Sequence, residues 1–291
     1  MTATLRYHRP ERLDEALDLL DEHGFDAKAL AGGQSLIPMM NAGFLAPEHL
    51  VDLNRLDGLD SVTVEDGTVR IGALVRHADL EHAGAEVAAA APLLPAAARW
   101  ISHEAVRNRG TFLGSLVHAD PSAEWPAVAL ATGASVRLVR KGGERWVPAA
   151  ELFLGPLESD LEPVEVALEA RLPAAPPGTA VSVQELAYRS GDYAVVGVAA
   201  QVRLDPGGAI AAVRTALFGV DATPVRPADA EAALLAAGPA GVHEAARLAA
   251  GAVNPTSDAT ASASYRREMV AVFYARAVRE ALDHAAAAQP R

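Results

Sequence analysis

The sequence of 291 residues contains no cysteine. This excludes disulfide bonds, and it removes the thiolate ligands that iron–sulfur clusters and most structural zinc sites need. Any iron–sulfur centre that works with this protein must therefore be carried by another chain. The nine histidines are scattered, and the closest candidate ligands, His77 with His82 and His118 with Asp120, lack a persuasive spacing. The sequence predicts no metal site.

Long apolar runs and positive charge are also scarce. The longest apolar stretch, residues 87–98, is interrupted by Pro92 and Pro95 and is too short to span a membrane. The first residues run into Arg9 and Glu11 instead of an apolar segment, so no secretory signal is predicted. With 25 basic and 37 acidic residues the net charge is −12, which disfavours nucleic acid and anionic lipid as partners. We expect a soluble cytoplasmic protein with no integral membrane segment.

Hydrophobic residues make up 51% of the sequence, which suits a globular protein of about two domains. The N-terminal part of the sequence, about residues 1–56, is predicted to form a small α/β lobe. Apolar residues at helical spacing predict a helix over 12–23, and short apolar runs predict strands near Tyr7 and over 27–30 and 50–53. A short helix is expected to begin near Pro38.

A second lobe is expected over about residues 57–175. Alternating residues around Asp66-Gly67 predict a β-hairpin formed by 61–65 and 68–72. Further strands are expected over 134–140, 145–147 and 164–172, helices over 78–80, 86–100 and 125–132, and a polar loop over 111–124. These elements predict a mixed or antiparallel sheet.

Three prolines and a glycine between Pro173 and Gly178 predict a linker, because such residues stop regular structure. Beyond it, residues 180–287 are expected to form a C-terminal α+β domain. Its predicted strands are 201–204 and 210–218, and its predicted helices are 228–237, 242–250 and 265–287. The expected fold class is thus α+β, with a two-lobed domain over 1–175 followed by a domain with a small antiparallel sheet and helices.

The most informative motif is Ala31-Gly32-Gly33-Gln34-Ser35, two adjacent glycines directly after a predicted strand. Glycine lacks a Cβ, so this turn can reach positive φ and let a ligand approach its N–H groups. Backbone N–H groups can hold a diphosphate without adding positive charge. Dinucleotide binding is therefore the first hypothesis, although an ordinary turn would have the same pattern.

A second stretch, residues 107–124, again combines glycines, hydroxyls and then acids, as in Thr111-Phe112-Leu113-Gly114-Ser115. Together the two stretches resemble the flavin subunit of the molybdenum hydroxylases, of the carbon monoxide dehydrogenase medium-subunit type. In that family an A-G-G-x-S loop and a T-x-G-G-N loop grip FAD. The resemblance extends over nearly the whole chain and includes residues 7–10, 35–40, 47–53 and 191–194.

The resemblance implies an oxidoreductase subunit that binds FAD. A large molybdenum subunit would oxidise the substrate, a small 2Fe-2S subunit would relay single electrons, and this chain's FAD would pass them to an external acceptor. The molybdenum cofactor and the 2Fe-2S clusters would thus be found only on partner subunits. No residue of this chain is predicted to be catalytic, since no nucleophile–base arrangement is visible.

The resemblance also implies the residues that would contact FAD. Glu124 occupies the place of an aspartate near the ribityl chain, Leu161 falls in the segment that walls the adenine pocket, and Tyr193 is expected beside the isoalloxazine, where its aromatic face can shield a planar ring. Tyr193 could instead plug a domain interface. The predicted FAD contacts are Ala31, Gly32, Gly33, Gln34, Ser35, Leu36, Thr111, Phe112, Leu113, Gly114, Ser115, Glu124, Leu161 and Tyr193.

Three positions depart from the family pattern. Leu113 replaces the first glycine of the usual pair, Ser115 replaces an asparagine, and Glu185 lies where relatives often carry lysine. If position 113 required positive φ, leucine would be strained there, and the affinity for FAD would suffer. Two other functions therefore stay open: a stand-alone flavin oxidoreductase of the same fold, and a scaffold subunit that has lost FAD.

Overall fold

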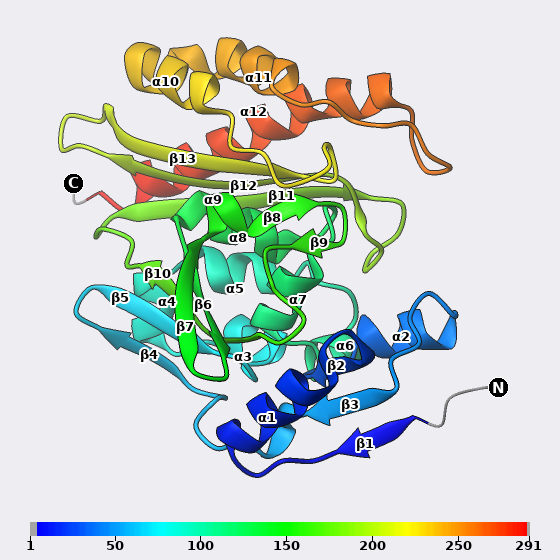
Figure 1. Cartoon of the computed structure of the whole chain (residues 1–291). Coiled ribbons are helices and arrows are strands. Elements are labelled where there is room, and N and C mark those ends of the chain that lie inside the picture. Colours follow the sequence, from blue (N-terminus) through cyan, green and yellow to red (C-terminus); the bar gives the residue numbers. More distant parts are fainter. Residues whose placement is uncertain (1–4, 290–291) are drawn as a thin grey trace.

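A computed structural model describes residues 5–289 of the chain. Within these residues the strands form three larger sheets and one short hairpin. Figure 1 shows the first sheet at the bottom, the second in the middle and the third near the top, beneath a layer of helices. This arrangement confirms the predicted α+β fold class.

The N-terminal lobe is a three-stranded parallel sheet with strand order β1-β3-β2. Helix α1 packs on it through Ala16, Leu17 and Leu20, which share a core with Val51. The predicted strands and helix of this lobe are confirmed. The elements are β1 (Arg6–His8), α1 (Leu13–His23), β2 (Ala27–Leu30), α2 (Leu36–Asn41) and β3 (His49–Asp52), with short 3-10 turns η1 (Gly24–Asp26) and η2 (Leu53–Arg55).

The second lobe contains a five-stranded antiparallel sheet with strand order β4-β5-β10-β6-β7. Its predicted hairpin is confirmed, since Asp66 and Gly67 both have positive φ, 48° and 71°, as a tight two-residue turn requires. The strands are β4 (Val62–Glu65), β5 (Thr68–Gly72), β6 (Ser135–Arg140), β7 (Gly143–Pro148) and β10 (Val166–Pro173), with the separate hairpin β8 (Phe153–Gly155) and β9 (Glu158–Ser159).

The helices of the second lobe differ from the prediction in two places. The helix expected over 86–100 is divided at Pro92. The segment 111–124, expected to be a polar loop, contains helix α7, because Phe112, Leu113 and Leu116 form a buried apolar face there. Trp125 and Phe112 fill the core between the helices, with ring centroids 5.0 Å apart. The helices are α3 (His77–Glu81), α4 (Ala85–Ala90), α5 (Leu93–Ala98), α6 (Glu104–Arg107), α7 (Phe112–His118), α8 (Glu124–Thr132) and α9 (Ala149–Leu152).

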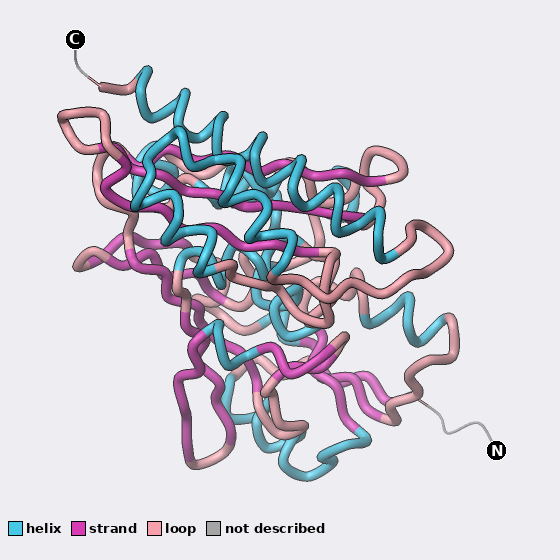
Figure 2. Tube along the Cα trace, turned by 90° about the horizontal axis from the view of Figure 1, so that it is seen from above, coloured by secondary structure: helices cyan, strands magenta, loops and turns pink. Residues whose placement is uncertain are grey.

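The C-terminal part is an antiparallel sheet, β11-β12-β13, covered on one face by three helices (Figure 2). Its other face packs on α5 and α8 of the second lobe, so β12 is buried on both faces. The prediction of a strand over 201–204 was too short and missed β11. The elements are β11 (Thr179–Ala187), β12 (Ala194–Leu204), β13 (Ile210–Phe218), α10 (Ala228–Ala237), η3 (Gly238–Gly241), α11 (Val242–Gly251) and α12 (Ala263–Ala287).

None of the helices in residues 5–289 is both long enough and apolar enough to cross a bilayer. The C-terminal sheet is tied to the second lobe by the Gly219 N–H, which donates a 2.7 Å hydrogen bond to the Pro121 carbonyl. This bond joins the C-terminal sheet to the segment that leads into α8.

Candidate flavin site

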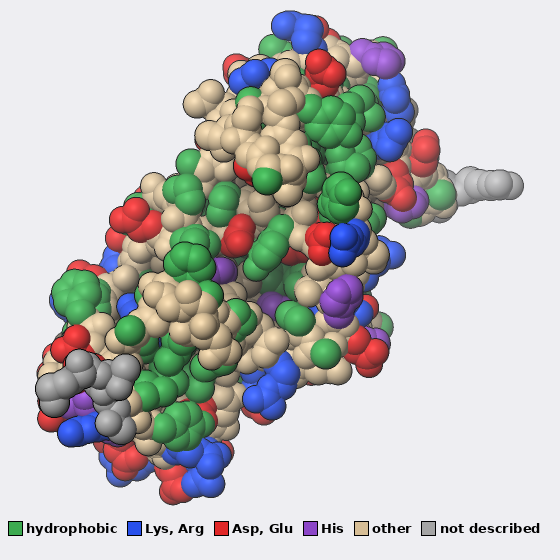
Figure 3. Space-filling model, turned by 90° about the vertical axis from the view of Figure 1, so that its right-hand side faces the viewer, with side chains coloured by type: hydrophobic (Ala, Val, Ile, Leu, Met, Phe, Trp, Pro, Cys, Tyr) green, Lys and Arg blue, Asp and Glu red, His purple; other side chains and the backbone are tan. Residues whose placement is uncertain are grey.

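A cavity of about 530 Å³ is lined by residues of the N-terminal lobe, the second lobe and the loop that precedes β12. Cavities of roughly 300–1,000 Å³ are typical of small-molecule sites. Figure 3 shows a hollow on the side of the molecule with hydrophobic, acidic and histidine side chains around it. Both glycine-bearing stretches of the sequence contribute to the lining of this one cavity.

The first stretch forms a loop between β2 and α2 whose backbone donors are free. Gly33 has a φ of 73°, the left-handed conformation that glycine adopts without strain. Within residues 5–289, the N–H groups of residues 32–35 donate to no protein acceptor. Several unpaired N–H groups along the wall of a cavity suit an anionic ligand, and a diphosphate has the oxygen atoms to accept from them.

The second stretch begins helix α7, and Thr111 is its N-cap. The Thr111 hydroxyl accepts a 3.1 Å hydrogen bond from the Gly114 N–H. A Cβ on Gly114 would lie only 2.6 Å from this hydroxyl oxygen, so glycine is required there by the cap. Gly114 and Ser115 line the cavity, and the Thr111 hydroxyl can still donate its proton to a ligand.

The two stretches touch each other at Gly32. A Cβ at this position would lie 2.3 Å from the Arg109 carbonyl oxygen and 2.7 Å from the Gly110 Cα, which are backbone atoms. Polar side chains reinforce the contact. Arg76 donates to the Arg109 carbonyl at 2.6 Å and to the Asn54 side-chain oxygen at 2.6 Å, and Asn54 donates to the Ala31 carbonyl at 2.9 Å. The relative position of the two loops is thereby fixed.

The floor beneath the second loop is a neutral histidine. His77 is buried, and burial followed by the charges of Arg76 and Arg107 lowers its pKa to about 4. Its Nδ1 accepts a 2.9 Å hydrogen bond from the indole N–H of Trp125. A Cβ on Gly110 would lie 2.5 Å from His77 Nε2, so this glycine lets the chain pass over the ring.

Acidic groups gather at another part of the cavity, which Asp120 and Glu124 line. Burial, followed by the charge of Asp120, raises the pKa of Glu124 to about 7. Burial, followed by the charge of Glu124, raises the pKa of Glu185 to about 8, and Glu185 Oε2 is buried without a hydrogen-bond partner. The carboxyl groups of Glu124 and Glu185 can therefore hold and release protons near neutral pH.

We expect the Glu185→Gln substitution to remove a pH dependence of stability. In the unfolded chain Glu185 ionises near its ordinary pKa of 4.5, and in the folded protein it ionises near 8. Between these pH values the folded state retains a proton that the unfolded state has lost, so the free energy of unfolding falls as the pH rises. The variant should be more stable than the native protein at pH 8 by about 1–3 kcal/mol and nearly unchanged at pH 4.5.

Urea unfolding of the full chain across this pH range measures the difference. Glu268→Gln is the matched control, because Glu268 is exposed on α12 and should show no pH-dependent gain. A constant difference between Glu185→Gln and the native protein at all pH values would contradict the assignment of the proton to Glu185.

The cavity contains nearly all of the residues that the sequence predicted as FAD contacts. Phe112 is the exception: its ring is fully buried against Trp125 and does not line the cavity. Leu113 lines the cavity from within helix α7 and has no positive φ, so the strain considered for it does not arise. Those that line the cavity are Ala31, Gly32, Gly33, Gln34, Ser35, Leu36, Thr111, Leu113, Gly114, Ser115, Glu124, Leu161 and Tyr193.

Three polar residues at or beside the cavity were not predicted from the sequence. Lys28 is the one lysine or arginine side chain among the described residues of the lining, and its place in β2 just before the glycine loop could have suggested it. Asn54 and Arg76 carry no motif. Tyr193 is 66% exposed, which does not suit a plug between domains. The pKa of its hydroxyl is raised by lost hydration and then by the charges of Asp120 and Glu124, which line the same cavity.

Free backbone donors, close loops and a cavity of this size define a protein that binds a dinucleotide cofactor. Residues 3–175 match the family described as the FAD-binding domain in molybdopterin dehydrogenase, and residues 182–281 match the CO dehydrogenase flavoprotein C-terminal domain. The chain belongs to the family of FAD-binding medium subunits of the molybdenum hydroxylases. It is thus the FAD-binding subunit of an oxidoreductase, and in this family molybdenum and iron–sulfur centres are found on other subunits.

Individual relatives cover almost the whole chain. The carbon monoxide dehydrogenase medium chain of Hydrogenophaga pseudoflava is 39% identical over 279 residues, which are 94% of this chain and 96% of the relative. The 6-hydroxypseudooxynicotine dehydrogenase complex subunit alpha of Paenarthrobacter nicotinovorans is 38% identical over 277 residues, 94% and 93% of the two chains.

Solved structures agree with this assignment. A carbon monoxide dehydrogenase of Hydrogenophaga pseudoflava superimposes with a TM-score of 0.93 at 39% identity and covers 98% of this chain and 99% of that one. Quinoline 2-oxidoreductase from Pseudomonas putida 86 gives a TM-score of 0.91 at 32% identity, again covering 98% and 99% of the two chains.

Proposed function

We propose that this chain accepts electrons at FAD from a small 2Fe-2S subunit and passes them to an external acceptor, while a large molybdenum subunit oxidises the substrate. Relatives that are named as subunits of dehydrogenases support the proposal. So does the lack of cysteine, because the chain cannot supply thiolate ligands to a cluster of its own. FAD supplies the redox chemistry, and the protein's part is to bind it, orient it and control access to it. The cytoplasmic location expected from the sequence stays a prediction.

The observation that carries the proposal is the meeting of the two loops around free backbone donors at Gly32. We assign the diphosphate of FAD to the N–H groups of residues 31–36 and to residues 111–115 at the start of α7. The Phe112 ring is excluded, because it does not line the cavity. Lys28 adds a positive charge on this wall. We place the ribityl chain near Glu124, the adenine near Leu161 and the isoalloxazine near Tyr193. The division of the chain into domains of residues 1–175 and 180–287 is part of the same proposal.

Purification of the protein from its native host tests the proposal directly. We expect it to be yellow and to be accompanied by a large molybdenum-containing chain and a small iron–sulfur chain. Reduction of the complex with substrate should bleach the flavin absorbance only when both companions are present. If the isolated chain instead turned over a substrate by itself, the stand-alone oxidoreductase would be favoured. A colourless chain that cannot be reconstituted with FAD would favour a scaffold.

We expect Tyr193→Ala to weaken FAD binding by about fivefold, because an aromatic contact with a planar ring is worth about 1 kcal/mol. Titration of the apoprotein with FAD, followed by quenching of flavin fluorescence, measures the change. Tyr188→Ala is the matched control, since Tyr188 is 76% exposed in the same loop and does not line the cavity. Equal losses in both variants would argue against a specific contact of Tyr193 with the ring.

A further inference from the structure

Three histidines that are far apart in sequence meet in the N-terminal lobe. His8 is the last residue of β1, His23 ends α1, and His49 is the first residue of β3. One ring nitrogen from each can be chosen so that all lie within 4.8 Å of one another. The cluster is tight, since His8 Nε2 lies 2.9 Å from His49 Nδ1 and the ring centroids of His23 and His49 are 3.6 Å apart.

The fold brings these rings together by its register. In the parallel pair β1–β3, Arg6 is opposite His49 and His8 is opposite Val51. Alternate residues of a strand share a face, so His8 and His49 project from the same face of the sheet as Val51. Helix α1 packs on this face through the core that contains Val51, and its last residue, His23, stacks on His49. His49 is 6% exposed, whereas His8 and His23 are partly exposed.

We propose that His8, His23 and His49 form a binding site for a divalent transition metal of the zinc, nickel or copper type. Imidazole nitrogen suits these ions, whereas magnesium and calcium prefer oxygen ligands. Zn–N distances of about 2.0–2.1 Å place tetrahedral ligand nitrogens roughly 3.3 Å apart, so the His8 and His49 rings need to separate only slightly to accept the ion. The partly exposed rings of His8 and His23 can rotate, and solvent can supply a fourth ligand.

The metal would join three elements of the lobe, namely β1, the end of α1 and β3. None of these histidines lines the flavin cavity in the described part of the chain. The site is thus independent of FAD, and its effect is expected to be structural. A ligand that binds only the folded state raises its stability in proportion to the logarithm of its concentration over Kd.

The test uses the full chain without a polyhistidine tag, stripped with a chelator, and titrates it calorimetrically with Zn²⁺ and, separately, Ni²⁺. We expect one equivalent to bind and the thermal midpoint of the chain to rise, with no response to Mg²⁺. His23→Gln and His8→Gln should each lower the affinity for Zn²⁺ by about tenfold or more. His82→Gln is the matched control, because His82 is exposed and lies outside the cluster, and it should bind as the native chain does.

A second measurement does not depend on the folding of any variant. Zn²⁺ should protect His8 and His23, the partly exposed members of the cluster, from diethyl pyrocarbonate, as read by peptide mass spectrometry of the native chain, while His82 is modified at an unchanged rate. The proposal is overturned if Zn²⁺ protects neither His8 nor His23, or if properly folded His23→Gln and His8→Gln chains bind Zn²⁺ as tightly as the native chain. FAD binding should be the same with and without Zn²⁺, so failure here leaves the flavin assignment intact.

Discussion

Replacement of Gly32 by alanine is expected to weaken FAD binding by about a hundredfold or more. A Cβ on Gly32 would lie 2.3 Å from the Arg109 carbonyl oxygen, and a backbone atom cannot rotate away as a side chain can. The two loops must therefore separate, and the backbone donors at residues 32–35 then lose their common geometry. Overpacking of this kind also costs about 1–3 kcal/mol of folding stability. Flavin content after purification, and FAD titration of the apoprotein, measure the loss of binding.

Gly251→Ala is the matched control for this substitution. Gly251 ends helix α11, has no positive φ and has no atom within 4 Å of a Cβ position, so alanine should be neutral or slightly stabilising there. A Gly32→Ala chain that purified with full FAD content would show that the loops can part without harm to the site. The assignment of the diphosphate to this contact would then be wrong.

The parts of the site that could be predicted from the sequence are those where the backbone conformation demands particular residues at neighbouring positions. Adjacent glycines after a strand indicate a loop with free N–H groups, and that loop is found at residues 31–35. The contacts that hold the loops together could not be predicted, because Asn54 and Arg76 are distant in sequence from the groups they bind. Gly114 was predicted to let FAD approach closely; in the structure the atom that it makes room for is the Thr111 hydroxyl oxygen, and its contact with FAD stays a prediction.

In the fold, too, elements with a local sequence signal could be predicted, and elements that depend on tertiary packing could not. The hairpin at Asp66-Gly67 and the amphipathic helix α1 have clear local signals and were predicted correctly. Strand β12 begins at Ala194, seven residues before the predicted start at Gln201, because both of its faces are buried and its sequence therefore does not alternate. The three-histidine cluster was missed for a related reason, since its members come from separate elements and no spacing connects them.

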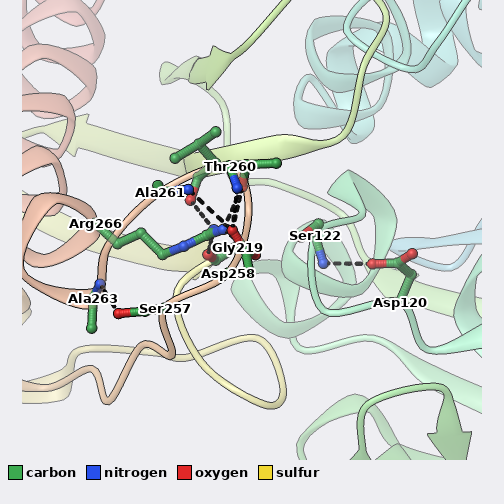
Figure 4. Close-up of polar contacts among 10 residues, drawn as sticks. Asp120, Ser122, Gly219, Ser257, Asp258, Thr260, Ala261, Ala263 and Arg266 are labelled. Carbon is green, nitrogen blue, oxygen red and sulfur yellow. Dashed lines mark hydrogen bonds and ion pairs between the residues drawn. The ribbon is translucent and has the colours of Figure 1, made fainter.

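A second large effect is expected for Arg266→Met, which should lower the free energy of unfolding by about 3–5 kcal/mol. Arg266 is 6% exposed on α12 and donates to the carbonyls of Val195 at 2.8 Å and Gly219 at 2.7 Å. It also donates to Asp258 at 2.6 Å (Figure 4). Methionine fills much of the same volume but cannot donate, so two buried carbonyl oxygens lose their partner.

The Arg266→Met substitution should also weaken FAD binding in the cavity. The Gly219 N–H donates to the carbonyl of Pro121, which lies in the segment 120–124, and Asp120, Ala123 and Glu124 of this segment line the cavity. Within that segment the Ser122 N–H donates to Asp120 at 2.8 Å (Figure 4). If Gly219 moves when Arg266 no longer holds it, this segment loses its anchor, and we expect FAD affinity to fall several-fold even in chains that remain folded.

Urea unfolding measures the loss of stability, and FAD titration of the folded fraction measures the coupling to the cavity. Arg247→Met is the matched control, because the Arg247 side chain is 69% exposed and its ion pair with Glu244 on the helix surface should contribute less than about 1 kcal/mol. Arg266→Lys should recover part of the lost stability, since an ammonium group can still donate to one or both carbonyls. If Arg266→Met were no more damaging than Arg247→Met, Arg266 would not be the residue that holds these strands and the Pro121 segment together.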